Sequence, residues 1–197
     1  MKILIFAALN SELVSVKNHL NNIKIHKSAK IDFLKTGIGT RNIKSNLTAL
    51  LKDNKYKYDY IINTGTAGSL KDELHVGEVF IPNTIEYFEK REKYFFDINH
   101  NFKMSKNWIT GILVTSDKDI INTTDKKNLK AKTKADAVDM EAYEAAKVSK
   151  KYNIPFISIK VISDYAESFN KSEYKKTLQG ITPFLAKATH KIINQII

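Results

Sequence analysis

The fold of this 197-residue chain is decided by the stretch Phe156-Ile157-Ser158-Ile159-Lys160-Val161-Ile162-Ser163-Asp164. Its nearly continuous apolar run predicts a strand that is buried on both faces, as the strands of a parallel sheet are. The run stops at a carboxylate, and in open α/β sheets ligands bind at the ends of such strands. A second carboxylate, Glu141, follows the short apolar segment 136–138 within Asp139-Met140-Glu141-Ala142. Together the two segments indicate carboxylate chemistry on a small molecule.

The other segments alternate between strand and helix patterns. Strands are expected at 2–8, 31–36, 58–64, 78–82, 84–88, 110–115 and 136–138, with the pair at 78–88 antiparallel. Helices are expected at 10–20 with Asn10 as N-cap, at 41–53, at 141–152 and from 172 onward, where Thr182-Pro183 could divide the helix. Residues 90–106 lack a period and are expected to form a loop. We therefore expect a single α/β domain over residues 1–197 with a mostly parallel sheet.

The composition is that of a globular protein, with 43% hydrophobic residues and a mean hydropathy of -0.32. No apolar run approaches the roughly 18 residues that a membrane span needs, so no membrane partner is expected. The apolar residues 3–8 are interpreted as a buried strand, because Asn10-Ser11-Glu12 follows where a signal-peptide cleavage site would lie. The absence of Cys excludes disulfides, a thiolate nucleophile and Cys-ligated zinc, and it favours a cytoplasmic location.

The net charge of +11 is compatible with nucleic-acid binding. However, the positive residues are scattered along the chain and are almost all Lys, with only Arg41 and Arg91 as arginines. Interfaces that clamp phosphates or read bases depend on Arg forks. No nucleic-acid partner is therefore expected, and steeply salt-dependent DNA binding would indicate the opposite.

Two glycine clusters follow predicted strands, Gly37-Ile38-Gly39 and Gly65-Thr66-Ala67-Gly68. Neither matches a dinucleotide fingerprint or a P-loop. Glycine at a strand end lets main-chain N–H groups approach a ligand closely, and Thr66 adds a hydroxyl there. A purely structural turn is the alternative reading.

The candidate acids also have structural readings. Glu12 in a first helical turn would complement the helix dipole by less than about 1 kcal/mol. Asp164 could cap a following helix, and Glu141 could be a surface acid in a first turn. The histidines at 19, 26, 75, 100 and 190 have no ligand spacing, so no metal site is expected.

Four motifs occur in order along the chain: Asn63-Thr64-Gly65-Thr66-Ala67-Gly68, Val76-Gly77-Glu78, Asp139-Met140-Glu141-Ala142 and Ile162-Ser163-Asp164. In this order they resemble the purine nucleoside phosphorylase/nucleosidase superfamily, and most closely its 5'-methylthioadenosine/S-adenosylhomocysteine nucleosidases. Ala8-Leu9-Asn10-Ser11-Glu12 is similar to the A-M-x-x-E segment of that branch. The resemblance implies a three-layer phosphorylase/hydrolase-like fold with a central mixed, mostly parallel twisted sheet flanked by helices. It also implies a homodimer that needs no cofactor and serves methionine salvage.

The resemblance implies hydrolysis of the N-glycosidic bond of a purine nucleoside, with 5'-methylthioadenosine and S-adenosylhomocysteine as leading substrates. Asp164, oriented by Ser163, would protonate or hydrogen-bond N7 of the departing base. Glu141 would accept hydrogen bonds from ribose hydroxyls, and Glu12 would activate the attacking water. The other implied substrate contacts are Thr66, Ala67 and Gly68, the main chain of Ile120 at the base edge, Met140 on the sugar, Lys160 near the water and Tyr174 on the 5' side.

Water is expected as the nucleophile. The phosphorylase branch has a Gly-Asp-Pro-x-Arg segment after its first strand, whereas this chain has a carboxylate, Glu12, which would repel phosphate. A phosphorolytic purine nucleoside phosphorylase and a hydrolase of futalosine-type nucleosides remain as alternatives. A nucleoside-binding protein without catalysis is a further alternative.

This chain departs from the family pattern at several positions. Asp119 stands near the position where the family has an aromatic ring on the base, Lys160 replaces an arginine, and Leu9 replaces a methionine near the sugar. The chain is also shorter between about residues 87 and 108, a region that shapes the 5' pocket in the family.

Overall fold

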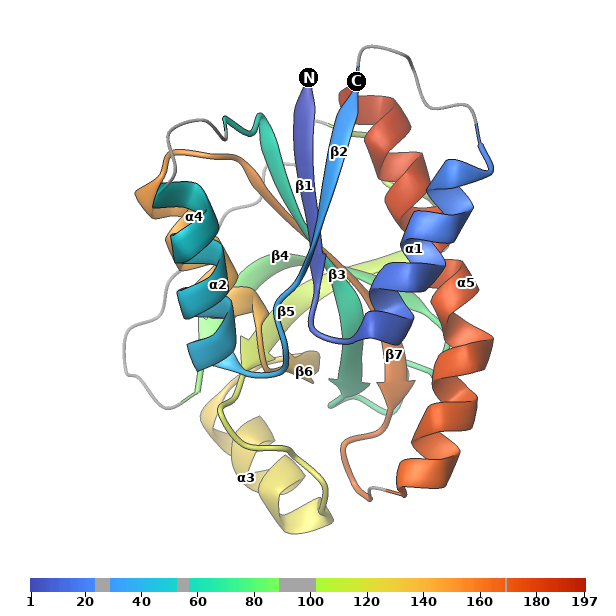
Figure 1. Cartoon of the computed structure of the whole chain (residues 1–197). Coiled ribbons are helices and arrows are strands. Elements are labelled where there is room, and N and C mark those ends of the chain that lie inside the picture. The colour runs from blue at the N-terminus through green and yellow to red at the C-terminus, as the bar shows by residue number, and fades with distance from the viewer. Residues whose placement is uncertain (24–28, 53–56, 89–101, 169) are drawn as a thin grey trace.

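The computed structural model of the chain describes residues 1–23, 29–52, 57–88, 102–168 and 170–197. Strands and helices alternate along these residues (Figure 1). The strands are β1 (Lys2–Ala7), β2 (Lys30–Lys35), β3 (Tyr60–Ser69), β4 (Val79–Tyr87), β5 (Trp108–Thr115), β6 (Ala137–Asp139) and β7 (Phe156–Asp164). The helices are α1 (Asn10–Asn21), α2 (Thr40–Lys52), α3 (Thr123–Lys132), α4 (Ala142–Lys151) and α5 (Lys171–Ile196).

The described strands form one sheet in the order β2-β1-β3-β6-β5-β4-β7. β7 also pairs with β3, so the strands from β3 to β7 close into a barrel-like ring. The pairings β3–β6 and β4–β7 are antiparallel, whereas the other pairings in the sheet are parallel. The prediction of a mixed sheet flanked by helices is confirmed. The ring differs from the open sheet of a three-layer fold.

Helices cover the strands on two sides. Figure 1 shows α1 and α5 together on one side of β1 and β2, and α2 and α4 on the other. Successive side chains of a strand point to opposite faces. Ile3 and Ile5 of β1 accordingly belong to the core under α1 and α5, while Leu4 and Phe6 belong to the core under α2 and α4. This burial on both faces explains the nearly continuous apolar composition of the strand.

Two strand predictions need correction. β3 does not stop at residue 64 but continues to Ser69, because its last third pairs with β6 and with the end of β7. The predicted antiparallel pair at 78–88 is one strand, β4, with a register irregularity between Pro82 and Thr84. A bulge of this kind bends a strand, which suits a sheet that closes on itself.

The helix predictions differ from the structure in three places. α3 was not expected, although Asn122 caps it by accepting a hydrogen bond from the Asp125 N–H. α5 is continuous through Pro183, because its buried face packs against α1 and β7 and outweighs the hydrogen bond that proline removes. The N-cap of α1 is Leu9 rather than Asn10. Of the predicted loop at 90–106, residues 90–101 lie outside the described residues.

Within the described residues, no helix is long and apolar enough to span a bilayer. The same residues contain no group of three or more His, Cys, Asp or Glu side chains that could hold a metal ion.

Candidate active site

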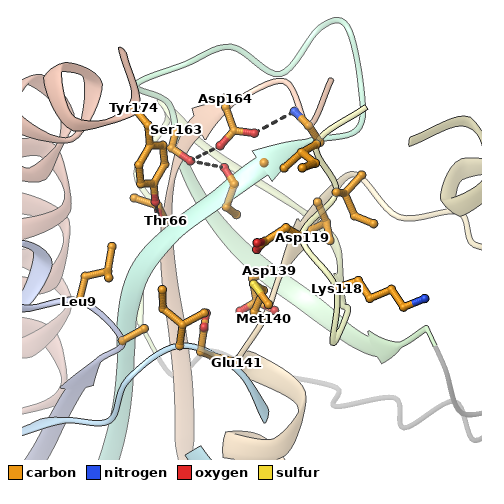
Figure 2. A pocket seen from close by; sticks show the side chains of 18 of the residues that line it. Leu9, Thr66, Lys118, Asp119, Asp139, Met140, Glu141, Ser163, Asp164 and Tyr174 are labelled. Carbon is orange, nitrogen blue, oxygen red and sulfur yellow. Dashed lines mark hydrogen bonds between the residues drawn. The ribbon is translucent and has the colours of Figure 1, made fainter. Parts of the chain in front are cut away.

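A cavity of about 210 Å³ lies at the carboxyl ends of β1, β5, β6 and β7, beside the last residues of β3 (Figure 2). The three candidate acids Glu12, Glu141 and Asp164 all line it, although they are far apart in the sequence. Seven of the other expected site residues also line it: Thr66, Ala67, Gly68, Ile120, Met140, Ser163 and Tyr174. Lys160 is absent from the cavity wall and lies behind it.

Glu12 is buried in the first turn of α1, with 2% of its surface exposed. Its Oε2 accepts a hydrogen bond from the Leu9 N–H at 3.0 Å, which closes the helix N-terminus. Its Oε1 accepts from the Thr66 N–H at 2.9 Å and from the Thr66 hydroxyl at 3.0 Å. Burial raises the pKa of Glu12, opposed by nearby Lys160 and by these hydrogen bonds. A carboxylate has about four acceptor positions, so a position remains for a ligand or water.

Glu141 lies immediately before α4 and is 7% exposed, so it is not the surface acid of the structural reading. Its Oε1 accepts a hydrogen bond from the Gly39 N–H at 3.1 Å. The glycine cluster at 37–39 thus directs a main-chain N–H at this carboxylate. Burial raises the pKa of Glu141 to about 7; Asp139 and Glu12 contribute to the increase, and Lys160 opposes it. Its other oxygen retains acceptor capacity.

Asp164 ends β7 and is fixed from both sides. Its Oδ2 accepts a hydrogen bond from the Ser163 hydroxyl at 2.6 Å, and its Oδ1 accepts from the Ala166 N–H at 2.8 Å. The Ala166 backbone has φ 53°, in the left-handed region, and this turn directs its N–H back toward the carboxylate. Figure 2 shows Ser163 and Asp164 side by side at one end of the pocket. The carboxylate is therefore held in one orientation at the cavity wall.

Tyr174 lies in the first turns of α5 and forms part of the cavity wall. Its hydroxyl lies 3.1 Å from the Thr66 hydroxyl, which links α5 to β3 and Glu12. Burial raises the pKa of Tyr174 to about 12, with the surrounding carboxylates adding to the increase, so the phenol stays neutral.

The loop after β5 brings Lys118, Asp119 and Ile120 to the cavity wall. Figure 2 shows the Asp119 carboxylate directed into the pocket, above Met140. The departure of this chain from the family pattern at Asp119 therefore falls within the cavity itself.

Asp139 belongs to the candidate site, although the sequence reasoning quoted it without assigning it there. It lines the cavity, is buried, and pairs with the Lys160 ammonium at 2.7 Å. A signal was available, because a lysine inside an apolar strand needs a buried carboxylate as a partner.

Gly68 is required by the close approach of β3 to β7. A Cβ at this position would lie 2.9 Å from Asp164 Oδ1 and 3.1 Å from the Ala166 Cβ. We therefore predict that Gly68→Ala displaces the Asp164 carboxylate and lowers kcat/KM about 100-fold, because misplacement of about 1 Å has effects of this size. Steady-state kinetics with the purine nucleosides that the sequence resemblance implies would measure the change.

Gly180→Ala is a matched control for this substitution, since a Cβ on that exposed helical glycine meets nothing within 4 Å. It should leave turnover unchanged and stabilise α5 slightly. Equal turnover by the Gly68→Ala and Gly180→Ala variants would contradict the close-approach argument.

A family model described as the phosphorylase superfamily matches residues 8–109 and 103–197. A 5'-methylthioadenosine/S-adenosylhomocysteine nucleosidase of Buchnera aphidicola subsp. Baizongia pistaciae is 33% identical, covering 83% of this chain and 78% of that protein.

Two solved structures share the fold. The 5'-methylthioadenosine/S-adenosylhomocysteine nucleosidase from S. pneumoniae, determined with a transition-state inhibitor, has a TM-score of 0.85 at 22% identity and covers 100% of both chains. A futalosine hydrolase mutant of Helicobacter pylori has a TM-score of 0.83 at 16% identity and covers 99% of both chains. At these identities the two likenesses concern the fold alone.

Proposed function

The chain belongs to the phosphorylase superfamily, and we propose that it is an N-ribosyl hydrolase that cleaves the N-glycosidic bond of purine nucleosides. The leading substrates are 5'-methylthioadenosine and S-adenosylhomocysteine, the two compounds in the name of the nucleosidase relative. The observation that carries the proposal is the convergence of Glu12, Glu141 and Asp164 on one cavity. Such a set supplies a general acid, a sugar-binding carboxylate and a general base.

The reaction separates into roles for each carboxylate. Water attacks the anomeric carbon while the C–N bond breaks and its electron pair passes to the purine. Glu12 takes a proton from the water, using the acceptor position that Leu9 and Thr66 leave open. Asp164 donates a hydrogen bond or proton to N7 of the base, so that negative charge does not accumulate there.

The sugar and the base are held by the remaining cavity residues. Glu141 accepts hydrogen bonds from the ribose hydroxyls with the oxygen that Gly39 leaves free, and Met140 packs on the sugar. The main chain of Ile120 reads the base edge, and Tyr174 covers the 5' side. The β3 segment Thr66-Ala67-Gly68 lines the wall between them.

Phosphorolysis is disfavoured by the charges around the cavity. A phosphate ion would meet the Glu12, Glu141 and Asp139 carboxylates. The buried Lys160 ammonium is already paired with Asp139. Repulsion between like charges in a buried site is large, so a neutral water is the better nucleophile.

We extend the proposal beyond the site: residues 1–197 act as one domain, in a cytoplasmic homodimer that serves methionine salvage. The support is the relationship to the nucleosidases, which spans most of both chains.

The test is chromatographic analysis of the base released from a nucleoside panel, with and without phosphate. We expect adenine from 5'-methylthioadenosine and S-adenosylhomocysteine at rates independent of phosphate. A strict need for phosphate would identify a phosphorylase. Release confined to a futalosine-type nucleoside would identify the activity named for the Helicobacter pylori neighbour. Tight nucleoside binding without any release would exclude catalysis.

A further inference from the structure

Lys160 is a lysine on β7 with 1% of its surface exposed, directly behind the cavity. Its Nζ lies 2.7 Å from Asp139 Oδ2 and 4.0 Å from Glu141 Oε2. A Cβ built on Gly65, its partner on β3, would lie 3.5 Å from Lys160 Nζ and 3.4 Å from Glu12 Oε1. The ammonium and the Glu12 carboxylate therefore lie on the same side of the bare backbone of Gly65, close enough for Lys160 to act on Glu12 through its charge. One cation thus lies between the two glutamates of the site.

Asp139 is the group that fixes this cation. Its Oδ1 accepts a hydrogen bond from the Thr115 hydroxyl at 2.6 Å, and its Oδ2 accepts from the Ala142 N–H at 2.9 Å as well as from Lys160. The Thr115 hydroxyl in turn accepts from the Tyr143 N–H at 3.0 Å. The carboxylate is thereby held by the end of β5 and the start of α4, and it has no freedom to follow a displaced lysine.

We propose that Asp139 is a positioning residue that anchors the Lys160 ammonium between Glu12 and Glu141, so that this buried ion pair sets the pH range in which the two glutamates are ionised. The proposal rests on the hydrolase function, in which both glutamates act as carboxylates. Asp139 acts through Lys160 and not on the substrate. In this role Lys160 contributes only its positive charge, so the bidentate hydrogen bonding of an arginine guanidinium is not needed at this position.

The charges around Glu12 and Glu141 determine the direction in which the pKa of each carboxyl is shifted. Glu141 faces the Lys160 cation from β7, which lowers its pKa, and the Asp139 and Glu12 anions, which raise it. Glu12 faces the same cation, which lowers its pKa. Burial alone would lower the pKa of Lys160, but Asp139, Glu141 and Glu12 together raise it, so the cation persists at neutral pH.

The pH dependence of kcat/KM reports ionisations of the free enzyme, and its acid limb is the fall in kcat/KM at low pH. Substituting Lys160 and substituting Asp139 should shift this limb in opposite directions. Lys160→Met removes the cation, and the limb should move up by about one pH unit. Asp139→Asn removes an anion beside Glu141 and frees the ammonium to approach it, so the limb should move down. Lys160→Arg keeps the charge and should keep the limb at its original pH. Hydrolysis of 5'-methylthioadenosine from pH 5 to 9 would measure these positions.

A merely structural pair would lower kcat in both variants without moving the limb. Limbs that stay in place, or that move in the same direction in the two variants, would overturn the proposal. Asp136→Asn is the matched control, because Asp136 lies three residues earlier, pairs with the exposed Lys71 and accepts the Ile112 N–H. Its limb should remain where the limb of the unmodified protein lies.

A single variant that leaves one buried charge unpaired could unfold. The double variant Asp139→Asn/Lys160→Met removes both charges and should be more stable than Lys160→Met alone. Lys160 changes the pKa of Glu141 more than Asp139 does. The acid limb of the double variant should therefore still lie at a higher pH than that of the unmodified protein. A limb at or below that position would contradict the proposal.

Carboxyl ¹³C NMR titration of glutamate-labelled protein tests the ion-pair proposal independently of the proposed hydrolase function. If the unmodified protein releases no purine, the hydrolase function fails. The Glu12 and Glu141 signals would still report whether Lys160→Met raises their midpoints, as the ion-pair proposal requires.

Discussion

Asp164→Asn should slow nucleoside hydrolysis severely while leaving nucleoside binding and the fold intact. Asparagine can still accept the Ala166 N–H through Oδ1. Its amide can donate to the Ser163 hydroxyl, whose single proton is then free to turn to the Ala67 carbonyl, 3.3 Å away. What is lost is the group that can transfer a proton to N7, and a positioned general acid contributes about 10²- to 10⁴-fold. We expect kcat to fall within that range, measured by purine release, with an unchanged Kd by calorimetry.

Ser163→Ala separates proton transfer from orientation. This variant keeps the acid but removes one of the two groups that hold it, so its loss of kcat should be clearly smaller than that of Asp164→Asn. Turnover by Asp164→Asn at the unmodified rate would remove Asp164 as the acid. A loss by Ser163→Ala as large as that of Asp164→Asn would assign the effect to orientation alone.

Glu12→Gln should block hydrolysis and also weaken the start of α1. The carboxylate accepts N–H groups on both oxygens, from Leu9 and from Thr66. Glutamine has one acceptor oxygen, so one of these buried N–H groups must face its NH₂ group. We expect kcat to fall by about 10²- to 10⁴-fold through loss of the base. The free energy of unfolding should fall by about 1 to 3 kcal/mol through the unsatisfied donor, measured by urea denaturation.

Thr66→Val is the comparison for Glu12→Gln. It removes the hydroxyl that donates to Glu12 at 3.0 Å but leaves the carboxylate and both N–H donors in place. Its effect on kcat should therefore be much smaller than that of Glu12→Gln. If Glu12→Gln lost stability but hydrolysed nucleosides at the original rate, Glu12 would be a helix-capping residue and not the base.

The strands and helices that were predicted correctly differ physically from those that were not. β1, β7 and α4 were predicted closely, because a buried strand or an amphipathic helix carries its period in its own residues. α3 was missed because its first turn is marked by Asn122 and Asp125 rather than by an apolar stripe. The continuity of α5 through Pro183 was missed because packing on α1 and β7 outweighs the local preference.

The candidate site follows the same pattern. Glu141 and Asp164 could be singled out from the sequence because they stand at the ends of apolar strands, whereas Glu12 and the role of each acid came from the family resemblance. The partners that hold them could not be, since Gly39, Thr66 and Ala166 belong to different elements. Lys160 was expected near the substrate, but the structure places its ammonium on Asp139 behind the cavity.

The sequence by itself determined which segments are buried strands, which acids stand at their ends and how little positive charge is concentrated in any one segment. These properties depend on neighbouring residues and on the preference of side chains for burial. Only the tertiary structure decided that β3 and β7 pair and close a ring, and that Lys160 joins Asp139 between two glutamates. Such contacts join residues distant in the chain, and their geometry follows from strand register and packing, which no local pattern encodes.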